Sequence, residues 1–269
     1  MAIRTWRSRR LFVTGGAGFL GRHIVNGHAS QGWEVVAPGS RSADLRHRDA
    51  VLAMVRDWKP AAIIHTAYRR GDRAAIVDAS GHVAEAAVAV GARLVHVSSD
   101  AVFGGRDEPY TEHDPVSPVN DYGRDKADAE TVVGQADPSA VIVRTSLIYG
   151  SGDLSVHEEA VRDAISGHTS TSFFTDEFRS PVLADDLANA LVDLAMMPQV
   201  TGILHLGGPD ALSRAELAVM IARRNGWNEA RLRFSTMAES GLTRPSRVVL
   251  DSALAATHGL GVRGPADLE

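Results

Sequence analysis

The fold of this chain is decided close to its start, by the stretch LFVTGGAGFLG at residues 11–21. Its apolar first part is typical of a buried strand that ends in a turn, and the residues after it predict a helix. In such a turn, Gly15 permits the tight bend, Gly18 lets backbone amides approach a pyrophosphate, and Gly21 allows helix and strand to pack closely. The stretch therefore predicts a dinucleotide site at the start of the first helix.

Apolar runs alternate with longer amphipathic stretches further along the chain. The expected strands are residues 10–14, 34–37, 61–65, 94–98, 141–145 and 203–206, and the expected helices are residues 21–31, 49–58, 74–90, 122–134 and 185–197. Parallel strands need crossover connections, which are usually helices. The alternation therefore predicts an α/β fold, a Rossmann-type doubly wound parallel sheet with helices on both faces.

Composition narrows the class of protein. The 269 residues are 44% hydrophobic and 23% charged, which is enough to bury a large core, and the net charge of −5 offers no basic field for nucleic acid. No apolar run approaches the ~20 residues of a membrane span. The absence of cysteine excludes disulfides and suits a cytoplasmic location, and the 11 histidines show no metal-ligand spacing. We therefore expect a cytoplasmic protein with no nucleic acid, membrane or metal partner.

The end of the second expected strand distinguishes between the nicotinamide cofactors. Its sequence, APGSR at residues 37–41, lacks the acidic residue that bonds the ribose hydroxyls in NAD sites. Ser40 and Arg41 can instead bind a 2′-phosphate, which favours NADPH over NADH, although Arg41 alone is also compatible with a surface arginine. Asp44 and Leu45 follow at the expected adenine edge, where Asp44 is alternatively a turn or capping residue.

The texture of the sequence changes after Gly150 and predicts a second folding unit. We expect residues 1–150, rejoined by about 182–208, to form an NADP-binding Rossmann domain. Residues 151–181 and 209–269 are expected to form a smaller C-terminal substrate-binding lobe, with a helix at 214–225 and a weak strand at 231–234.

The candidate catalytic groups are Tyr122 and Lys126, four residues apart in an expected helix, and Ser99 at the end of an expected strand. Positions four apart share a helix face, so the ammonium can favour the ionised phenol. A strand-end serine at the carboxyl edge of an α/β sheet is placed to donate to a carbonyl. Each motif alone is also compatible with an ordinary helix pair or a Ser-Ser turn. Together with the glycine-rich stretch, they predict a site that donates a proton.

Nine motifs together resemble the extended short-chain dehydrogenase/reductases, and in particular the dTDP-4-dehydrorhamnose reductase family. They are TGGAGFLG (14–21), SSDAVFGG (98–105), PYTE (109–112), YGRDK (122–126), RTSLIYG (144–150), FRSP (178–181), HLGG (205–208), RPS (244–246) and LD (250–251). The resemblance implies that Ser99 and Tyr122 hold the substrate carbonyl, that Tyr122 gives the proton, and that Lys126 binds the nicotinamide ribose. It also implies hydride from C4 of NADPH.

The resemblance extends these roles to a full set of site residues. The cofactor-binding residues are expected to be Gly15, Gly18, Phe19, Leu20, Gly21, Ser40, Arg41, Asp44, Leu45, Thr66, Ala67, Tyr68, Val97, Ser98, Tyr122 and Lys126. The substrate-binding residues are expected to be Asp100, Ala101, Leu147, Arg179 and Arg244. The implied activity is that of an NADPH-dependent carbonyl reductase acting on a small molecule, a 4-keto-6-deoxy sugar nucleotide. The oligomeric state is open, with a homodimer as the candidate.

The chain departs from the family pattern near the expected substrate. Ser99 replaces a threonine and keeps the hydroxyl, but Ala101, Gly104 and Leu147 stand where tyrosine, aspartate and tryptophan are usual. Loss of aromatic surface leaves open a different nucleotide sugar or a ketone without a nucleotide. Asp78 stands where an asparagine is common, which can alter a proton relay because a carboxylate cannot donate as an amide does.

Other polar groups favour structural roles. Residues 112–114 (EHD) lie among prolines and predict an ordered loop, Asp185 and Asp186 are expected at a helix N-terminus, and His65 is expected to be packed rather than to act as a base. Arg179 and Arg244 either reach substrate phosphates or are surface charges.

Three rival functions follow from the wider superfamily. A dehydratase is disfavoured because Ala101, and not a glutamate, follows Asp100. An epimerase would use the same serine, tyrosine and lysine, and a non-catalytic NADP-binding subunit, similar to the regulatory subunit of methionine adenosyltransferase, would retain much of the same constellation.

Overall fold

The computed structural model describes residues 9–28, 32–39, 44–150, 152–242 and 244–264. The chain forms two compact units. The first contains residues 1–99, 120–143 and 188–204, and the second contains residues 100–119, 144–187 and 205–269. Within the described ranges, no helix has the length and apolar character needed to cross a membrane.

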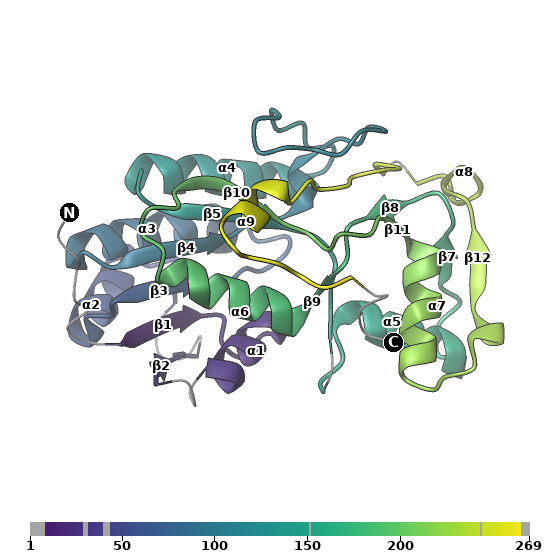
Figure 1. Ribbon diagram of the computed structural model, residues 1–269, viewed down its shortest axis with the longest axis horizontal. Helices are drawn as coiled ribbons and strands as arrows, with labels where there is room; N and C mark the ends of the chain where they lie inside the picture. Colours follow the sequence, from purple (N-terminus) through teal and green to yellow (C-terminus); the bar gives the residue numbers. More distant parts are fainter. Residues whose placement is uncertain (1–8, 29–31, 40–43, 151, 243, 265–269) are drawn as a thin grey trace. The chain divides into compact units, whose positions relative to one another are not determined.

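The first unit is built on a six-stranded sheet with the order β10-β5-β4-β3-β1-β2 (Figure 1). The strands are β1 (Arg10–Thr14), β2 (Glu34–Val36), β3 (Ala62–His65), β4 (Arg93–Val97), β5 (Val141–Thr145) and β10 (Gly202–Leu206). Strands β2, β1, β3, β4 and β5 pair in parallel, as the alternating pattern predicted. The expected late strand is β10, which joins the sheet beside β5. The order reverses between β1 and β3, and ligands of such sheets bind at the carboxyl ends of the strands at this point.

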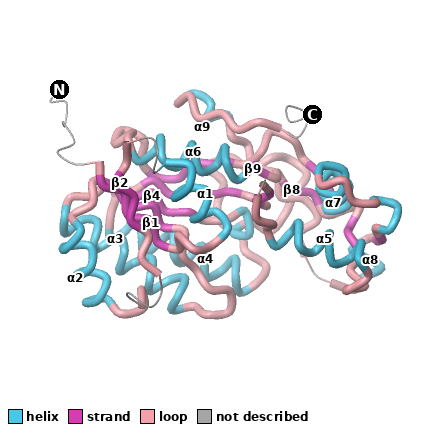
Figure 2. Tube along the Cα trace, turned by 90° about the horizontal axis from the view of Figure 1, so that it is seen from below, coloured by secondary structure: helices cyan, strands magenta, loops and turns pink. Residues whose placement is uncertain are grey.

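Helices cover both faces of this sheet. Figure 2 shows α2, α3 and α4 on one face, with α1 and α6 on the other. Their bounds are α1 (Phe19–His28), α2 (Arg48–Trp58), α3 (Ala79–Val90), α4 (Asp121–Ala136) and α6 (Ala184–Ala195). The segment expected to be helical from residue 74 begins with a π-helical turn, Ala74–Asp78, before α3.

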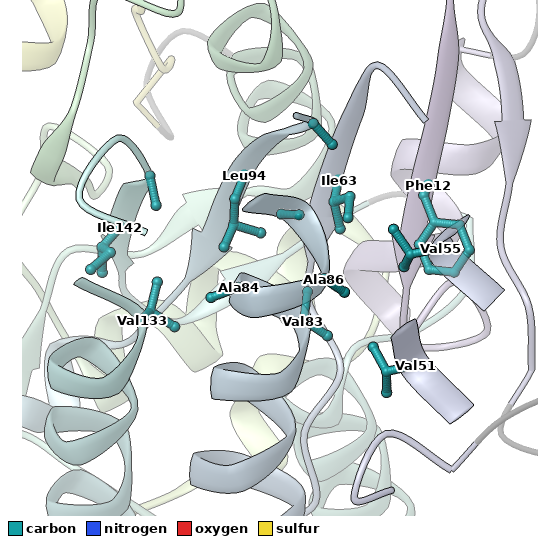
Figure 3. Close-up of a cluster of buried hydrophobic side chains, with 13 residues drawn as sticks. Phe12, Val51, Val55, Ile63, Val83, Ala84, Ala86, Leu94, Val133 and Ile142 are labelled. Carbon is teal, nitrogen blue, oxygen red and sulfur yellow. The ribbon is translucent and has the colours of Figure 1, made fainter. Parts of the chain in front are cut away.

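The core on the α2–α3–α4 face takes one large side chain from each of the central strands. Phe12, Ile63, Leu94 and Ile142 pack there against apolar side chains of the three helices (Figure 3). Successive side chains of a strand point to opposite faces, so the flanking strand residues are left for the other helical layer. The same strands are buried at nearly every position, which explains their continuous hydrophobicity in the sequence.

The second unit combines short strands with two longer helices. Its two-stranded sheets pair β6 (Ile148–Tyr149) with β9 (Val182–Leu183), β8 (Phe178–Arg179) with β11 (Leu212–Ser213), and β7 (Ser172–Phe174) with β12 (Arg233–Ser235). The helices are α5 (Val156–Ser166) and α7 (Arg214–Arg224), and the short elements are η3 (Asp100–Val102), η4 (Glu229–Arg231), α8 (Met237–Ser240) and α9 (Ala253–Thr257). A buried cluster that includes Tyr149, Phe173 and Ile221 forms the core of this unit.

Helix α5 lies in a region for which the sequence predicted no element. Ser155 accepts a hydrogen bond from the backbone of Glu158, whose side chain accepts one from the backbone of Ser155. This capping box starts the helix, and Val161 and Ile165 form its buried face. The Ser-x-x-Glu spacing and the apolar residues four apart were sequence signals that could have predicted α5.

Candidate active site

The glycine-rich turn between β1 and α1 is packed so tightly that Gly15, Gly16 and Gly21 cannot carry a side chain without displacing their neighbours. Gly15 has a φ of +72°, and a Cβ atom there would lie 2.8 Å from Thr66 Oγ1 and from the backbone nitrogen of Ala67. A Cβ atom on Gly21 would lie 2.1 Å from the carbonyl oxygen of Gly15. The turn itself is closed by a hydrogen bond of 2.8 Å from the Gly18 amide to the same carbonyl oxygen. These contacts require glycine for the bend at Gly15 and for the close approach of α1 at Gly21.

The start of α1 has the properties of an anion site. Gly18 is exposed, and the first turn of α1, which follows it, carries no acidic side chain. Backbone amides and the helix dipole favour a negative group at such a position. Behind the turn, Leu20 is buried and Phe19 packs edge-on against His23, with ring centroids 4.8 Å apart. The residues present therefore fit a dinucleotide pyrophosphate, and cofactor contacts at these positions stay a prediction.

A directional hydrogen-bond chain holds the turn to β3 and to the crossover helix. Ser80 Oγ donates to the Ile76 carbonyl oxygen at 2.5 Å, so its lone pair accepts from His65 Nε2 at 3.1 Å. Nδ1 of His65 is then the acceptor for the Thr14 hydroxyl at 2.6 Å, which in turn accepts from the Ala67 amide at 3.3 Å. The chain requires a neutral imidazole, and burial, together with the charge of Lys126, lowers the pKa of His65 to about 3. His65 is therefore packed, as the sequence predicted.

Two expected cofactor residues that flank this chain have defined surroundings. Thr66 donates through its hydroxyl to the Thr14 carbonyl oxygen at 2.8 Å, which ties the end of β3 to the end of β1. Tyr68 is 54% exposed and therefore presents its ring to solvent or to a ligand.

The expected adenine end of the cofactor site is only partly described. Ser40 and Arg41 lie outside the described residues, so their predicted phosphate contacts stay a prediction. Asp44 binds the Arg46 guanidinium at 2.6 Å and accepts from the Arg46 amide at 3.0 Å, and this hydrogen bonding holds the pKa of Asp44 well below its ordinary value. Asp44 thus has the turn role that the sequence left open. Leu45 packs against the core beside α2 and α3.

Helix α4 positions Tyr122 and Lys126 one turn apart. Asn120 caps the helix by accepting from the Gly123 amide at 2.9 Å, which places Tyr122 in the first turn. Tyr122 is half-buried against Ile76, Val77 and Ala129, and its ring centroid lies 5.8 Å from that of Tyr68.

Sequence reasoning missed a cation beside this phenol. The guanidinium carbon of Arg70 lies 4.4 Å from the centroid of the Tyr122 ring. A cation at this distance over an aromatic face is attracted to it, by ~0.5–1 kcal/mol at exposed sites. Nothing in the spacing of Arg70 and Tyr122 in the sequence announces the contact.

Lys126 is deeply buried at the carboxyl end of β4. The residue is 5% exposed. Its Nζ atom donates to the Val97 carbonyl oxygen at 3.0 Å and lies 5.0 Å from the centroid of the Tyr68 ring. Burial lowers the pKa of Lys126 to about 8, and the charge of Glu130 acts in the opposite direction. At neutral pH the amine is therefore still mostly protonated.

The two serines after β4 have different surroundings. Ser98 Oγ donates to Glu130 Oε1 at 2.5 Å, and both residues are buried. Ser99 is the next residue along the chain and is half-buried. Glu130 was missed by the sequence analysis, although positions 122, 126 and 130 are spaced four apart on α4 and therefore share one face.

The expected substrate residues lie in the second unit, and the surroundings of three of them are defined within that unit. Asp100 is buried and accepts from Ser146 Oγ at 2.6 Å. Ala101 follows it in the η3 turn and is half-buried. Leu147 packs against the buried cluster that contains Tyr149, so this residue also contributes to the core.

The two expected phosphate-binding arginines have different environments. Arg179 is buried: its guanidinium lies 3.2 Å from Glu177 Oε1 and 3.9 Å from Asp100 Oδ2, and it donates to the carbonyl oxygens of Phe178 and Pro245. The surface-charge alternative is therefore wrong for Arg179. The side chain of Arg244 is 46% exposed and lies 3.5 Å from Glu177 Oε2.

The remaining polar candidates hold loops in place. Asp114 binds Arg106 at 2.6 Å, and Glu112 accepts from the His205 amide at 3.0 Å, which confirms that this run is an ordered loop. Asp186 stands in the first turn of α6, but its carboxylate binds the guanidinium and the backbone amide of Arg263 at distances from 2.7 Å. Across the described ranges, no group of three or more His, Asp or Glu side chains is arranged to hold a metal ion.

The parallel sheet and the glycine-rich turn define a Rossmann-type fold. The chain belongs to the family described as the RmlD substrate binding domain, whose model matches residues 9–264. The match covers both units of the structure, and the sequence-based assignment to an RmlD-like extended short-chain dehydrogenase/reductase is confirmed.

Relatives in sequence include a reductase and a subunit of methionine adenosyltransferase. The chain is 34% identical over 266 residues to the dTDP-4-dehydrorhamnose reductase of Mycolicibacterium smegmatis (strain ATCC 700084 / mc(2)155), with 94% of this chain and 81% of that protein covered. It is 32% identical over 284 residues to methionine adenosyltransferase 2 subunit beta of Rattus norvegicus, with 96% and 85% covered.

Solved structures agree on the fold. A dTDP-4-dehydrorhamnose reductase from Clostridium acetobutylicum ATCC 824 superposes with a TM-score of 0.86 at 26% identity, and 96% of each chain is covered. The dTDP-4-dehydrorhamnose reductase from Bacillus anthracis str. Ames, solved in complex with NADP, also gives a TM-score of 0.86 at 24% identity, with 97% of this chain and 96% of that chain covered.

Proposed function

We propose that this chain is an NADPH-dependent carbonyl reductase whose substrate is a 4-keto-6-deoxy sugar nucleotide. The observation that carries the proposal is the buried Lys126, which donates to the Val97 carbonyl oxygen at the carboxyl end of β4, one helical turn after Tyr122. Burying an amine costs free energy, so a lysine at a buried position indicates that its charge is needed for function. The similarity to dTDP-4-dehydrorhamnose reductases along 94% of the chain supports the same activity.

Each proposed catalytic residue has a distinct task. The Ser99 hydroxyl donates to the carbonyl oxygen of the substrate, and the Tyr122 phenol donates to the same oxygen and then transfers its proton to it. The Lys126 ammonium and the Arg70 guanidinium stabilise the phenolate that remains. Bound NADPH would supply the hydride for the carbonyl carbon. The glycine-rich turn and the start of α1 would hold its pyrophosphate.

The substrate is expected to differ from that of typical family members in the part that contacts Ala101 and Leu147. Both positions lack the aromatic ring that the family usually has, so stacking on the substrate is reduced. We therefore propose a keto-deoxysugar nucleotide as the class, with dTDP-4-dehydrorhamnose as the first compound to test. An activity on CH–OH or C=O groups, a cytoplasmic location and a homodimer remain predictions from the sequence.

The decisive experiment measures NADPH oxidation at 340 nm with a panel of 4-keto nucleotide sugars and simple ketones. Turnover with a nucleotide sugar is expected. NADPH binding, measured by fluorescence, is recorded in parallel so that a failure of cofactor binding is distinguished from a failure of chemistry. Firm NADPH binding with no oxidation across the whole panel would reject the reductase proposal.

Tyr122→Phe is the matched variant for this assay. It keeps the ring that packs against Ile76, Val77 and Ala129 and removes only the acidic hydroxyl. Because positioned general acids contribute about 10²–10⁴-fold, kcat is expected to fall by that factor while the Kd for NADPH stays within about twofold. An unchanged kcat would mean that another group donates the proton.

The similarity to methionine adenosyltransferase 2 subunit beta supports a second candidate function, a non-catalytic subunit that binds NADP. This function predicts NADPH binding without turnover, and a cofactor affinity that depends on Lys126 but not on the Tyr122 hydroxyl. Turnover of the wild type therefore separates the two functions, because both predict that NADPH binding survives Tyr122→Phe.

A further inference from the structure

Ser98 is the first residue after β4, and neighbouring elements hold both its backbone and its side chain. Its amide donates to the Val143 carbonyl oxygen of β5 at 2.7 Å. Its hydroxyl donates to Glu130 Oε1 of α4 at 2.5 Å, and the two residues are only 3% and 6% exposed. Well-packed apolar groups are often as stable as buried charged ones, or more so. The pair is therefore better explained by a task at the site than by stability.

The bond between Ser98 and Glu130 lies next to a second tie between the same two elements. Lys126, one helical turn before Glu130, donates through Nζ to the carbonyl oxygen of Val97, the residue before Ser98, at 3.0 Å. Two consecutive residues at the strand end are therefore held by two consecutive turns on one face of α4. The end of β4 cannot shift along α4 without breaking both bonds, and each break would leave a buried polar group without its partner.

The tied segment leads directly into the proposed catalytic serine. Strand β4 ends at Val97, and Ser99 is the second residue beyond that point. The Tyr122 phenol belongs to the other side of the tie, in the first turn of α4. The separation of the Ser99 and Tyr122 hydroxyls therefore depends on how the end of β4 is attached to α4. Such positioning matters, because a displacement of about 1 Å can lower a rate by about 100-fold.

We propose that Ser98 and Glu130 form a positioning pair, whose hydrogen bond holds the end of β4 against α4 so that Ser99 and Tyr122 can share one carbonyl oxygen. A hydroxyl has a single proton, and Ser98 donates its proton to Glu130. Ser98 thus acts through Ser99 and not by donating to the substrate. The negative charge of Glu130 also favours the protonated form of Lys126. The inference rests on the proposed function, because it concerns the same catalytic groups.

The test is the steady-state rate of NADPH oxidation, with the ketone that the wild type reduces, for variants that change the bond in different ways. Ser98→Ala removes the bond and is expected to lower kcat by about 10- to 100-fold, with KM and the Kd for NADPH within about threefold. Glu130→Gln keeps an oxygen that accepts from Ser98, so its kcat at the pH optimum is expected to fall by less. Ser98→Thr keeps the hydroxyl and is expected to recover most of the kcat.

Ser139→Ala is the matched control. Ser139 donates to Asp137 Oδ1 at 2.6 Å just beyond the other end of α4, so this variant breaks a bond of the same kind in the same unit. It is expected to lower the melting temperature by about 2–4 °C and to leave kcat unchanged. A purely structural role of the Ser98–Glu130 bond would give Ser98→Ala the same result as this control.

Circular dichroism shows whether each variant folds. If Ser98→Ala does not fold, Ser98→Cys replaces it, because a thiol is a weaker donor than a hydroxyl and is expected to lower kcat in the same direction. A folded variant that lacks the bond and keeps the wild-type kcat would overturn the inference, and so would a loss of NADPH affinity as large as the loss of kcat. An inactive wild type rejects the reductase and with it this role, whereas an active wild type with an equally active Ser98→Ala rejects the positioning pair alone.

Discussion

The buried amine of Lys126 makes a quantitative prediction for the pH dependence of stability. Its pKa is lowered by burial from the ordinary 10.5 to about 8 in the folded protein. Between these values the unfolded chain keeps the proton that the folded chain has released. Because the unfolded state then binds more protons, the free energy of unfolding of the wild type rises with pH in this window and loses that gain as the pH falls through about 8.

The perturbation that isolates this contribution is Lys126→Met, which keeps most of the side-chain volume and removes the titrating group. The free energy of unfolding of the wild type rises by ~1.36 kcal/mol for each pH unit above the folded-state pKa of about 8. Between pH 7 and pH 9.5, only the interval above about pH 8 contributes, so the wild type gains ~2 kcal/mol relative to the variant. The variant also loses the hydrogen bond to the Val97 carbonyl oxygen, but that loss is the same at both pH values and cancels in the comparison.

The assay is urea unfolding of both proteins at pH 7 and pH 9.5, followed by circular dichroism. The chain has one other lysine, the exposed Lys59, so Lys59→Met is the matched control and is expected to follow the wild type at both pH values. A difference between wild type and Lys126→Met that changes by less than about 0.5 kcal/mol over this range would refute the assigned burial of the amine.

Three further predictions concern the cofactor turn, the partner of Lys126 and the choice of cofactor. Gly21→Ala places a Cβ atom 2.1 Å from a backbone oxygen and is expected to destabilise the fold by ~1–3 kcal/mol or more in thermal and urea unfolding, whereas Gly27→Ala in the open on the same helix is expected to be neutral or to stabilise by up to ~1 kcal/mol. Glu130→Gln removes the charge that raises the pKa of Lys126, so the alkaline fall in kcat/KM is expected at lower pH than in the wild type; superimposable pH profiles would contradict this coupling. Arg41→Ala is expected to weaken NADPH by about tenfold and NADH by much less in fluorescence titrations, and equal losses for both would exclude a 2′-phosphate contact.

Most of the sheet was predictable because its signals are local. The run at residues 10–14 matches β1 (Arg10–Thr14), and the late apolar run at 203–206 lies within β10 beside β5. Strands that are buried on both faces need apolar residues at every position, so their hydrophobicity is visible without any tertiary information. Helix α5 was not predicted because the sequence around it is polar, and only its capping box marked the start of the helix.

The side-chain pairings of the site were not predictable to the same degree. Tyr122 and Lys126 are recognisable because helix geometry fixes their relation within one element. The contact of Arg179 with Asp100 and that of Arg70 with the Tyr122 ring join segments far apart in the sequence, and no spacing rule connects them. The role of a charged residue is also ambiguous, because the local sequence does not distinguish an arginine that binds a ligand from one that is buried in an ion-pair network.

The cost of burying Lys126 bears on the choice between a reductase and a regulatory subunit. Replacing a buried charge by a well-packed apolar group is often neutral or stabilising, so a lysine at this position is best explained by a ligand that needs its charge. Binding the ribose of a nicotinamide cofactor is such a need, and both functions share it. Only catalysis requires in addition that the phenol of Tyr122 donate a proton, and we expect the Arg70 guanidinium, 4.4 Å from the centroid of its ring, to act on that step rather than on ribose binding. Arg70→Gln should therefore lower kcat, with the Kd for NADPH unchanged, in a reductase; a change in the Kd for NADPH instead would place Arg70 in cofactor binding.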